Sequence, residues 1–137
     1  MKYEVLSERN GGEVRVTCPK DLMPYLSSYS KKRQECFIAI TMNGNQEVIR
    51  IHLVTLGILN RTLIHPREIF VRAIKDHAAS LIICHNHPSG SLEPSKEDRE
   101  ATKRLQDAGK LLGIEVLDHL IISKAGYFSF REQGDLL

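Results

Sequence analysis

The sequence is poor in cysteine, lacks tryptophan and has no long apolar run. Its three cysteines form no Cys-x-x-Cys pair, and one is left over under any disulfide scheme. Reduced thiols in a reducing compartment are the simpler interpretation, so we expect a cytoplasmic protein. Apolar runs such as Leu81–Cys84 are far shorter than the ~20 residues that cross a membrane. Residues 1–16 alternate charged and apolar residues, so they lack the apolar core of a signal peptide.

An excess of charge of one sign is also missing, because 19 Lys and Arg residues face 17 Asp and Glu residues for a net charge of +2. Domains that bind nucleic acid usually carry a clustered excess of Lys and Arg. The basic run here is only Lys31–Arg33, so charge does not support DNA association. With 137 residues, of which 42% are hydrophobic, the chain can bury a core as a single domain.

The pattern of apolar residues predicts alternating strands and helices. Val14 and Val16 alternate with charged residues and predict a first short strand, followed by a helix over residues 21–33. The β-rich stretch Glu35–Met42 meets Asn43-Gly44-Asn45, a strong hairpin signal, and Val48–Val54 continues as the return strand.

The second half of the chain continues this alternation. A helix opens at His65-Pro66, and the apolar run from Ala79 to His85 predicts a strand buried on both faces. Ser95 begins a helix that Gly113 ends, and residues 114–123 and 127–130 supply the last strands. The fold class is therefore α/β (α+β), with a mixed β-sheet flanked by helices.

Two histidines stand at the end of the predicted buried strand. Residues two apart on a strand face the same side, so His85 and His87 can direct both imidazoles at one point. Pro88, Gly90 and Pro94 punctuate the loop that follows, and Asp98 lies in the first turn of the next helix. Two imidazoles and one carboxylate form a three-ligand zinc site whose fourth position is left for water, which is typical of catalytic zinc.

Each member of this set also has an ordinary interpretation. A single histidine usually fills a core or a surface, and Ser95 with Asp98 could form only a helix-capping pair. The joint spacing, His-x-His followed by Ser and Asp at the start of a helix, favours the metal site.

The spacing His85-x-His87, seven residues, Ser95, two residues, Asp98 resembles the JAMM motif of MPN+ metalloproteases. The surrounding His-Asn-His-Pro-Ser-Gly resembles the RadC branch, as do Gln34–Phe37, Pro66–Phe70 and Leu117–Ile122. The resemblance implies a cytidine-deaminase-like JAMM/MPN architecture. We expect one such domain over residues 1–137, with residues 1–20 as an N-terminal extension or first strand and without the helix-hairpin-helix region of long RadC proteins.

The resemblance also implies roles for particular residues. In the family, two histidines and an aspartate bind Zn²⁺. The matching residues in this sequence are His85, His87 and Asp98. The serine, here Ser95, aids the transition state, and an upstream glutamate activates water. Glu35 matches the position of that glutamate.

Other residues compete for these roles or extend them. Glu47 on the return strand is the rival of Glu35, whereas Glu68 belongs to a helix. Asp118 and His119 lie on a strand predicted beside the site. They either orient a ligand histidine through its second ring nitrogen or are ordinary strand residues.

The implied function is zinc-dependent hydrolysis of peptide or isopeptide amides, with a peptide or protein as the partner. We expect the edge of Val48–Val54 to take an extended peptide by strand addition. A nuclease is disfavoured because the helix after Ser95 holds neither His nor Asn, and a zinc deaminase because no Pro-Cys-x-x-Cys is present. The alternative is a non-enzymatic or DNA-associated accessory module, since RadC proteins carry a DNA-repair label.

Overall fold

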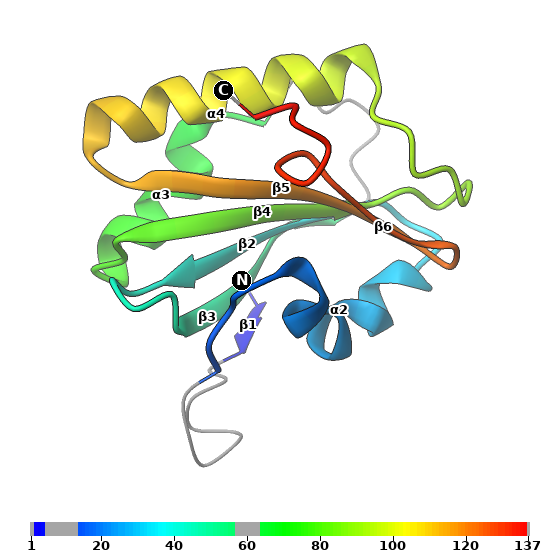
Figure 1. The fold of residues 1–137 in the computed structure, drawn as a ribbon, viewed down its shortest axis with the longest axis horizontal. Coiled ribbons are helices and arrows are strands. Elements are labelled where there is room, and N and C mark those ends of the chain that lie inside the picture. Colours follow the sequence, from blue (N-terminus) through cyan, green and yellow to red (C-terminus); the bar gives the residue numbers. More distant parts are fainter. Residues whose placement is uncertain (1, 5–13, 57–63, 137) are drawn as a thin grey trace.

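The computed structural model describes residues 2–4, 14–56 and 64–136. It contains a six-stranded mixed sheet in the order β1-β3-β2-β4-β5-β6 with helices on both faces (Figure 1). The elements are β1 (Lys2–Glu4), a 3₁₀ helix (Pro19–Leu22), α2 (Met23–Ser30), β2 (Cys36–Met42), β3 (Val48–Leu56), α3 (Pro66–Lys75), β4 (Ser80–Asn86), α4 (Lys96–Leu112), β5 (Glu115–Ser123) and β6 (Gly126–Ser129). The predicted α+β fold is confirmed. Within the described residues, the helices are too short or too polar to span a bilayer.

Strand β4 lies in the middle of the sheet, antiparallel to β2 and parallel to β5. All seven of its residues are buried, as the continuous apolar run predicts for a strand covered on both faces. The α2 side carries the even-numbered residues of β2 and β4, such as Ile38 and Ile82, and the α3–α4 side carries odd-numbered ones, such as Ala39 and Ile83. Figure 1 shows α3 and α4 on one side of the sheet and α2 on the other.

Helix α4 begins and ends where its sequence predicts. Ser95 is the N-cap, its hydroxyl accepts the backbone N–H of Asp98, and Gly113 follows the last turn at φ 73°. This left-handed conformation favours glycine because it has no Cβ. Asp98 is therefore held in the first turn by the start of the helix itself.

The N-terminal part of the sheet differs from the prediction in two respects. Val14 and Val16 do not form a strand, because Arg15 makes only an isolated bridge with Glu47. The first strand is instead β1, which pairs with β3 over Ile51–Leu53. The middle of β3 is therefore covered by β1, and the expectation that the edge of Val48–Val54 takes an extended peptide stays a prediction.

The helix predicted over residues 21–33 is divided, because the 3₁₀ helix precedes α2 and α2 ends at Ser30. Strand β2 begins at Cys36 rather than at Glu35. These differences of one to three residues are typical of element ends.

A buried carboxylate holds the end of α3 against the sheet. The Asp76 side chain is 5% exposed. It bonds three side chains of β2 and β3, namely Thr41 Oγ1 at 2.7 Å, Arg50 at 2.6 Å and His52 Nε2 at 2.7 Å. Burial alone would raise the pKa of Asp76, but the hydrogen bonds of His52 and Thr41 and the Arg50 guanidinium lower this pKa below its usual value.

Substituting Asp76→Asn should lower the free energy of unfolding by about 1–3 kcal/mol at neutral pH, because the charged hydrogen bonds are lost. A lowered folded-state pKa contributes stability above the unfolded value of 3.8, and this contribution disappears as pH falls through the folded-state pKa. Urea unfolding at several pH values measures the difference. Asp107→Asn, in an exposed pair with Lys103, should change it by less than about 0.5 kcal/mol. A difference for Asp76→Asn that stays constant down to pH 2 would contradict this account.

Candidate metal centre

His85 and His87 lie at the end of β4 on the α3–α4 side of the sheet. His85 is opposite Phe37 on β2 and beside Ile121 on β5, so neighbouring strands flank it on both sides. Its side chain is fully buried, and the Phe37 ring stacks on its ring with an interplanar angle of 5°. His87 is 8% exposed, so it is the histidine nearer to solvent.

Asp98 reaches the same point from the first turn of α4. The carboxylate lies 3.2 Å from His85 Nε2 and 3.3 Å from His87 Nε2, and the two Nε2 atoms are 3.1 Å apart. The three predicted ligands therefore come together, and the group could hold a metal ion.

These spacings can be compared with what a zinc ion needs. Tetrahedral zinc with ligand bonds of about 2.0–2.1 Å requires its ligand atoms to be roughly 3.3–3.4 Å apart. The observed separations of 3.1–3.3 Å are within 0.3 Å of that requirement. The donor set of two imidazoles and a carboxylate also suits zinc, so residues and geometry both fit the ion.

The second nitrogen of each ring is held by a hydrogen bond. His87 Nδ1 lies 2.9 Å from the carbonyl oxygen of Ser91, which can only accept, so Nδ1 carries the proton and Nε2 keeps its lone pair. His85 Nδ1 lies 2.8 Å from His119 Nε2. Outer partners of this kind fix the orientation of histidine ligands.

The charge states favour a cation at this point. Burial lowers the pKa of His85, against the opposing effect of Asp98, and so favours the neutral ring. Burial alone would raise the pKa of Asp98, but contacts with His85 and His87 and the Ser95 N–H hold it well below its usual range. The group thus combines a His85 ring that favours its neutral form with a carboxylate that stays ionised.

Ser95 has the capping role that the sequence left as an alternative. Its hydroxyl accepts the Asp98 N–H at 3.0 Å, and its own N–H donates to Asp98 Oδ2 at 2.8 Å. This capping box does not compete with the metal group, because it is what turns the Asp98 carboxylate toward the two histidines. Ser95 is half-buried, beside the ligands.

Glu35 lies immediately before β2 and next to the centre. It precedes by two residues Phe37, which is opposite His85 in the β2–β4 ladder. Its charge also acts on the pKa of His85. Glu47 lies at the other end of β2, where Asn43 donates to its carboxylate, and Glu68 pairs with arginines on the exposed side of α3.

Asp118 and His119 are placed differently from each other. His119 contacts His85 directly. Asp118 lies on the α2 side and lines a surface hollow with Thr17 and Arg131. Its carboxylate accepts the Ser129 hydroxyl at 2.5 Å and the Arg131 N–H at 3.0 Å. The contacts of Asp118 therefore support the turn after β6, and the residue that bonds the second nitrogen of His85 is a histidine.

Asn86 is a residue that the sequence reasoning missed. It stands between the two histidines and so faces the α2 side, where its Oδ1 accepts the Cys36 N–H at 2.5 Å. Its Nδ2 donates to the carbonyls of Lys32 at 3.3 Å and Gln34 at 3.0 Å. These bonds hold the segment that carries Glu35 against the strand that carries the ligands. Alternation of faces within His-Asn-His was the available signal.

These features define an α+β domain with a buried metal-binding group of two histidines and one aspartate. The chain belongs to the RadC family, because the family model for the RadC-like JAB domain matches residues 16–135.

Similar proteins occur in bacteria and archaea. A UPF0758 protein of Methanospirillum hungatei is 47% identical over 125 residues, which cover 90% of this chain and 56% of that protein. A UPF0758 protein of Symbiobacterium thermophilum is 51% identical over 100 residues, covering 73% of this chain and 43% of that protein. The chain thus spans about half the length of the curated relatives it matches, and their names state no activity.

Substituting Asn86→Ala should lower the free energy of unfolding by about 2–4 kcal/mol, because a buried backbone N–H loses its acceptor together with two further bonds. Urea unfolding measures this loss. Gln34→Ala is the matched control, since Asn86 bonds the Gln34 carbonyl and not its exposed side chain. Equal stability of the two variants would show that Asn86 does not anchor the Glu35 segment.

Proposed function

We propose that this domain is a zinc-dependent hydrolase of peptide or isopeptide amides, a metallopeptidase of the JAMM type. The observation that carries the proposal is the ligand geometry: two imidazole nitrogens and one carboxylate lie at zinc spacing. A second carboxylate, that of Glu35, is close enough for its charge to act on His85. A domain that served only as a scaffold would have no use for this combination.

His85, His87 and Asp98 would hold the ion. When bound, zinc supplies Lewis acidity that activates water and polarises an amide carbonyl. Glu35 would take a proton from the attacking water and return it to the leaving amine.

Ser95 would act on the substrate oxygen. Its hydroxyl oxygen accepts the Asp98 N–H, and a hydroxyl group can accept one hydrogen bond and donate another. A hydrogen bond to the oxyanion of a tetrahedral intermediate typically contributes about 3 kcal/mol to lowering the barrier. The same residue thus caps the helix and would donate to the reacting group.

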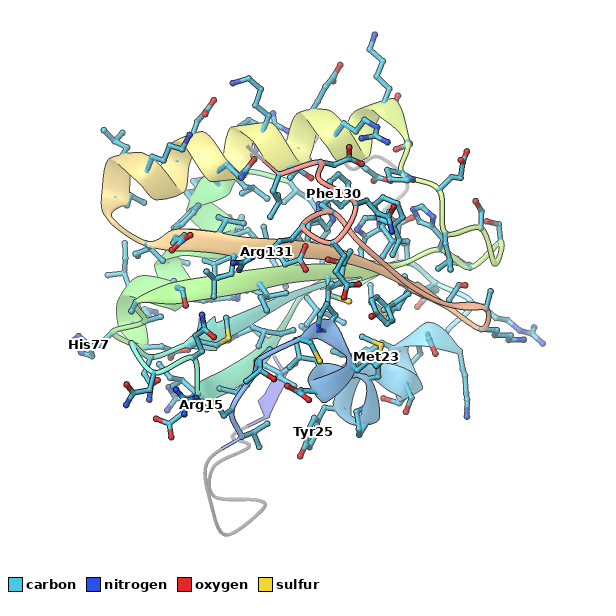
Figure 2. The ribbon with its side chains drawn as sticks, in the orientation of Figure 1. Arg15, Met23, Tyr25, His77, Phe130 and Arg131 are labelled. Atoms are coloured by element: carbon cyan, nitrogen blue, oxygen red, sulfur yellow. The ribbon has the colours of Figure 1, made fainter. Side chains whose placement is uncertain are left out.

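Protein purified without a metal-chelating tag should contain close to one zinc per chain, and His85→Ala with His87→Ala should contain almost none, because both nitrogen ligands are gone. Elemental analysis by mass spectrometry measures the ratio. His65→Ala with His77→Ala is the matched control, since His65 is exposed before α3 and His77 lies at the periphery of the molecule (Figure 2). Undiminished zinc in the first pair would remove the assignment.

Glu35→Gln should retain zinc and lose about 10²–10⁴-fold in rate, because only the proton acceptor is removed. Mass spectrometry of new termini in proteome-derived peptide pools, together with isopeptide-linked peptides, measures the rate. Glu47→Gln, at the far end of β2, should cleave like the wild type.

Two outcomes would count against this assignment. Full activity of Glu35→Gln would exclude Glu35 as the base. Zinc-loaded wild type that cleaves no pool but retains double-stranded DNA would favour the non-enzymatic, DNA-associated module.

A further inference from the structure

A chain of hydrogen bonds leads from the backbone of α4 to the first ligand histidine. Thr102 lies one turn after Asp98, is 2% exposed, and its Oγ1 is 2.7 Å from the Asp98 carbonyl oxygen. The same Oγ1 is 2.5 Å from His119 Nδ1 on β5. A carbonyl oxygen only accepts, so the single hydroxyl proton of Thr102 goes to Asp98, as is common for threonine in helices. His119 Nδ1 must then donate to Thr102.

This order continues through His119. A neutral imidazole carries one proton, so a protonated Nδ1 makes Nε2 of His119 an acceptor. His119 Nε2 lies 2.8 Å from His85 Nδ1, which therefore donates, and His85 Nε2 keeps its lone pair. Both rings are 0% exposed, so bulk water does not compete for these hydrogen bonds.

We propose that Thr102 and His119 are positioning residues that place the proton of His85 on Nδ1 and thereby present Nε2 as a ligand. The inference rests on the proposed function only in taking zinc as the ion. The proton order itself is a property of the metal-free protein. Both histidines of the centre thus have the same tautomer, with the proton on Nδ1. In His87 a backbone carbonyl fixes this tautomer, and in His85 the hydrogen bonds through His119 and Thr102 fix it.

The ring of His119 is held rigidly enough for this role. It stacks on Phe130 with centroids 4.6 Å apart and an interplanar angle of 7°. Phe130 lies on the α4 side of β5 (Figure 2). The Arg99 guanidinium carbon lies over its ring, 5.9 Å from the ring centroid. Because stacking fixes the plane of His119, Nδ1 stays directed at Thr102 and Nε2 at His85.

The chain also couples the ligands to each other. Thr102 bonds the backbone of Asp98, the third ligand, and its other bond leads through His119 to His85, the first ligand. A displacement of the start of α4 would therefore disturb the orientation of His85 as well as the position of Asp98.

The test compares Thr102→Val, which keeps the shape but lacks the hydroxyl, with Thr102→Ser, which keeps it. Nitrogen-15 NMR of the histidine rings in the metal-free protein reports which nitrogen carries the proton. Wild type and Thr102→Ser should show His85 protonated on Nδ1. In Thr102→Val the acceptor of His119 Nδ1 is gone, so a second tautomer of His85, protonated on Nε2, should appear.

The second readout is zinc affinity, measured by competition with a chelator. Thr102→Val should bind zinc roughly 10- to 100-fold more weakly, and Thr102→Ser should bind like the wild type. If Thr102→Val does not fold, His119→Gln replaces it: its amide oxygen can accept from His85 and should preserve the Nδ1 tautomer, whereas His119→Leu should not.

Several results would overturn the proposal. One is wild-type His85 protonated on Nε2; another is an unchanged tautomer in Thr102→Val or His119→Leu. Weaker zinc binding that Thr102→Ser shares with Thr102→Val would also do so, because packing and not the hydroxyl would then be its cause. Failure of the proposed function is distinguishable, since a protein that binds zinc and cleaves no amide still reports the proton order.

Discussion

Two nitrogen lone pairs and a carboxylate lie within 3.3 Å of one another in the interior of this domain, and the rest of the site is arranged around that fact. The two nitrogens repel each other when neither carries a proton, and all three groups have lost the water that would solvate them, so a site of this kind costs stability without its ion. A cation removes the conflict. The surroundings therefore have to hold three ligands together against their mutual repulsion and also keep protons away from their ligand atoms.

The scaffold meets this demand through the two faces of one strand end. His85 and His87 face α4, and Asn86 between them faces α2 and bonds the segment that carries Glu35. The capping box of α4 turns the Asp98 carboxylate toward the histidines while Ser95 remains beside them. Secondary-structure chemistry that would stabilise any domain, a central strand and a capped helix, here sets the positions of all the groups that the proposed reaction needs.

The residues around the proposed metal centre differ in their exposure to solvent. His85, Asp98 and His119 are buried, while His87 is slightly exposed and Glu35 and Ser95 are half-buried. The residues that we propose as proton acceptor and oxyanion donor are thus nearer to solvent, whereas His119, which we propose orients a ligand, lies in the core. The chain spans about half of its curated relatives, so the choice of substrate in such longer proteins belongs to the proposal and not to the family assignment.

Local periodicity in the sequence was enough to predict β4, the capped helix α4 and the convergence of His85, His87 and Asp98. Alternation along a strand and the first turn of a helix are set by neighbouring residues, so these features are readable without a fold. Tertiary structure decided the rest. The contact of His119 with His85, the anchoring by Asn86, the α2-side position of Asp118 and the covering of β3 by β1 each depend on which strands pair and in which register. No single segment encodes that register, because it results from the packing of the whole sheet.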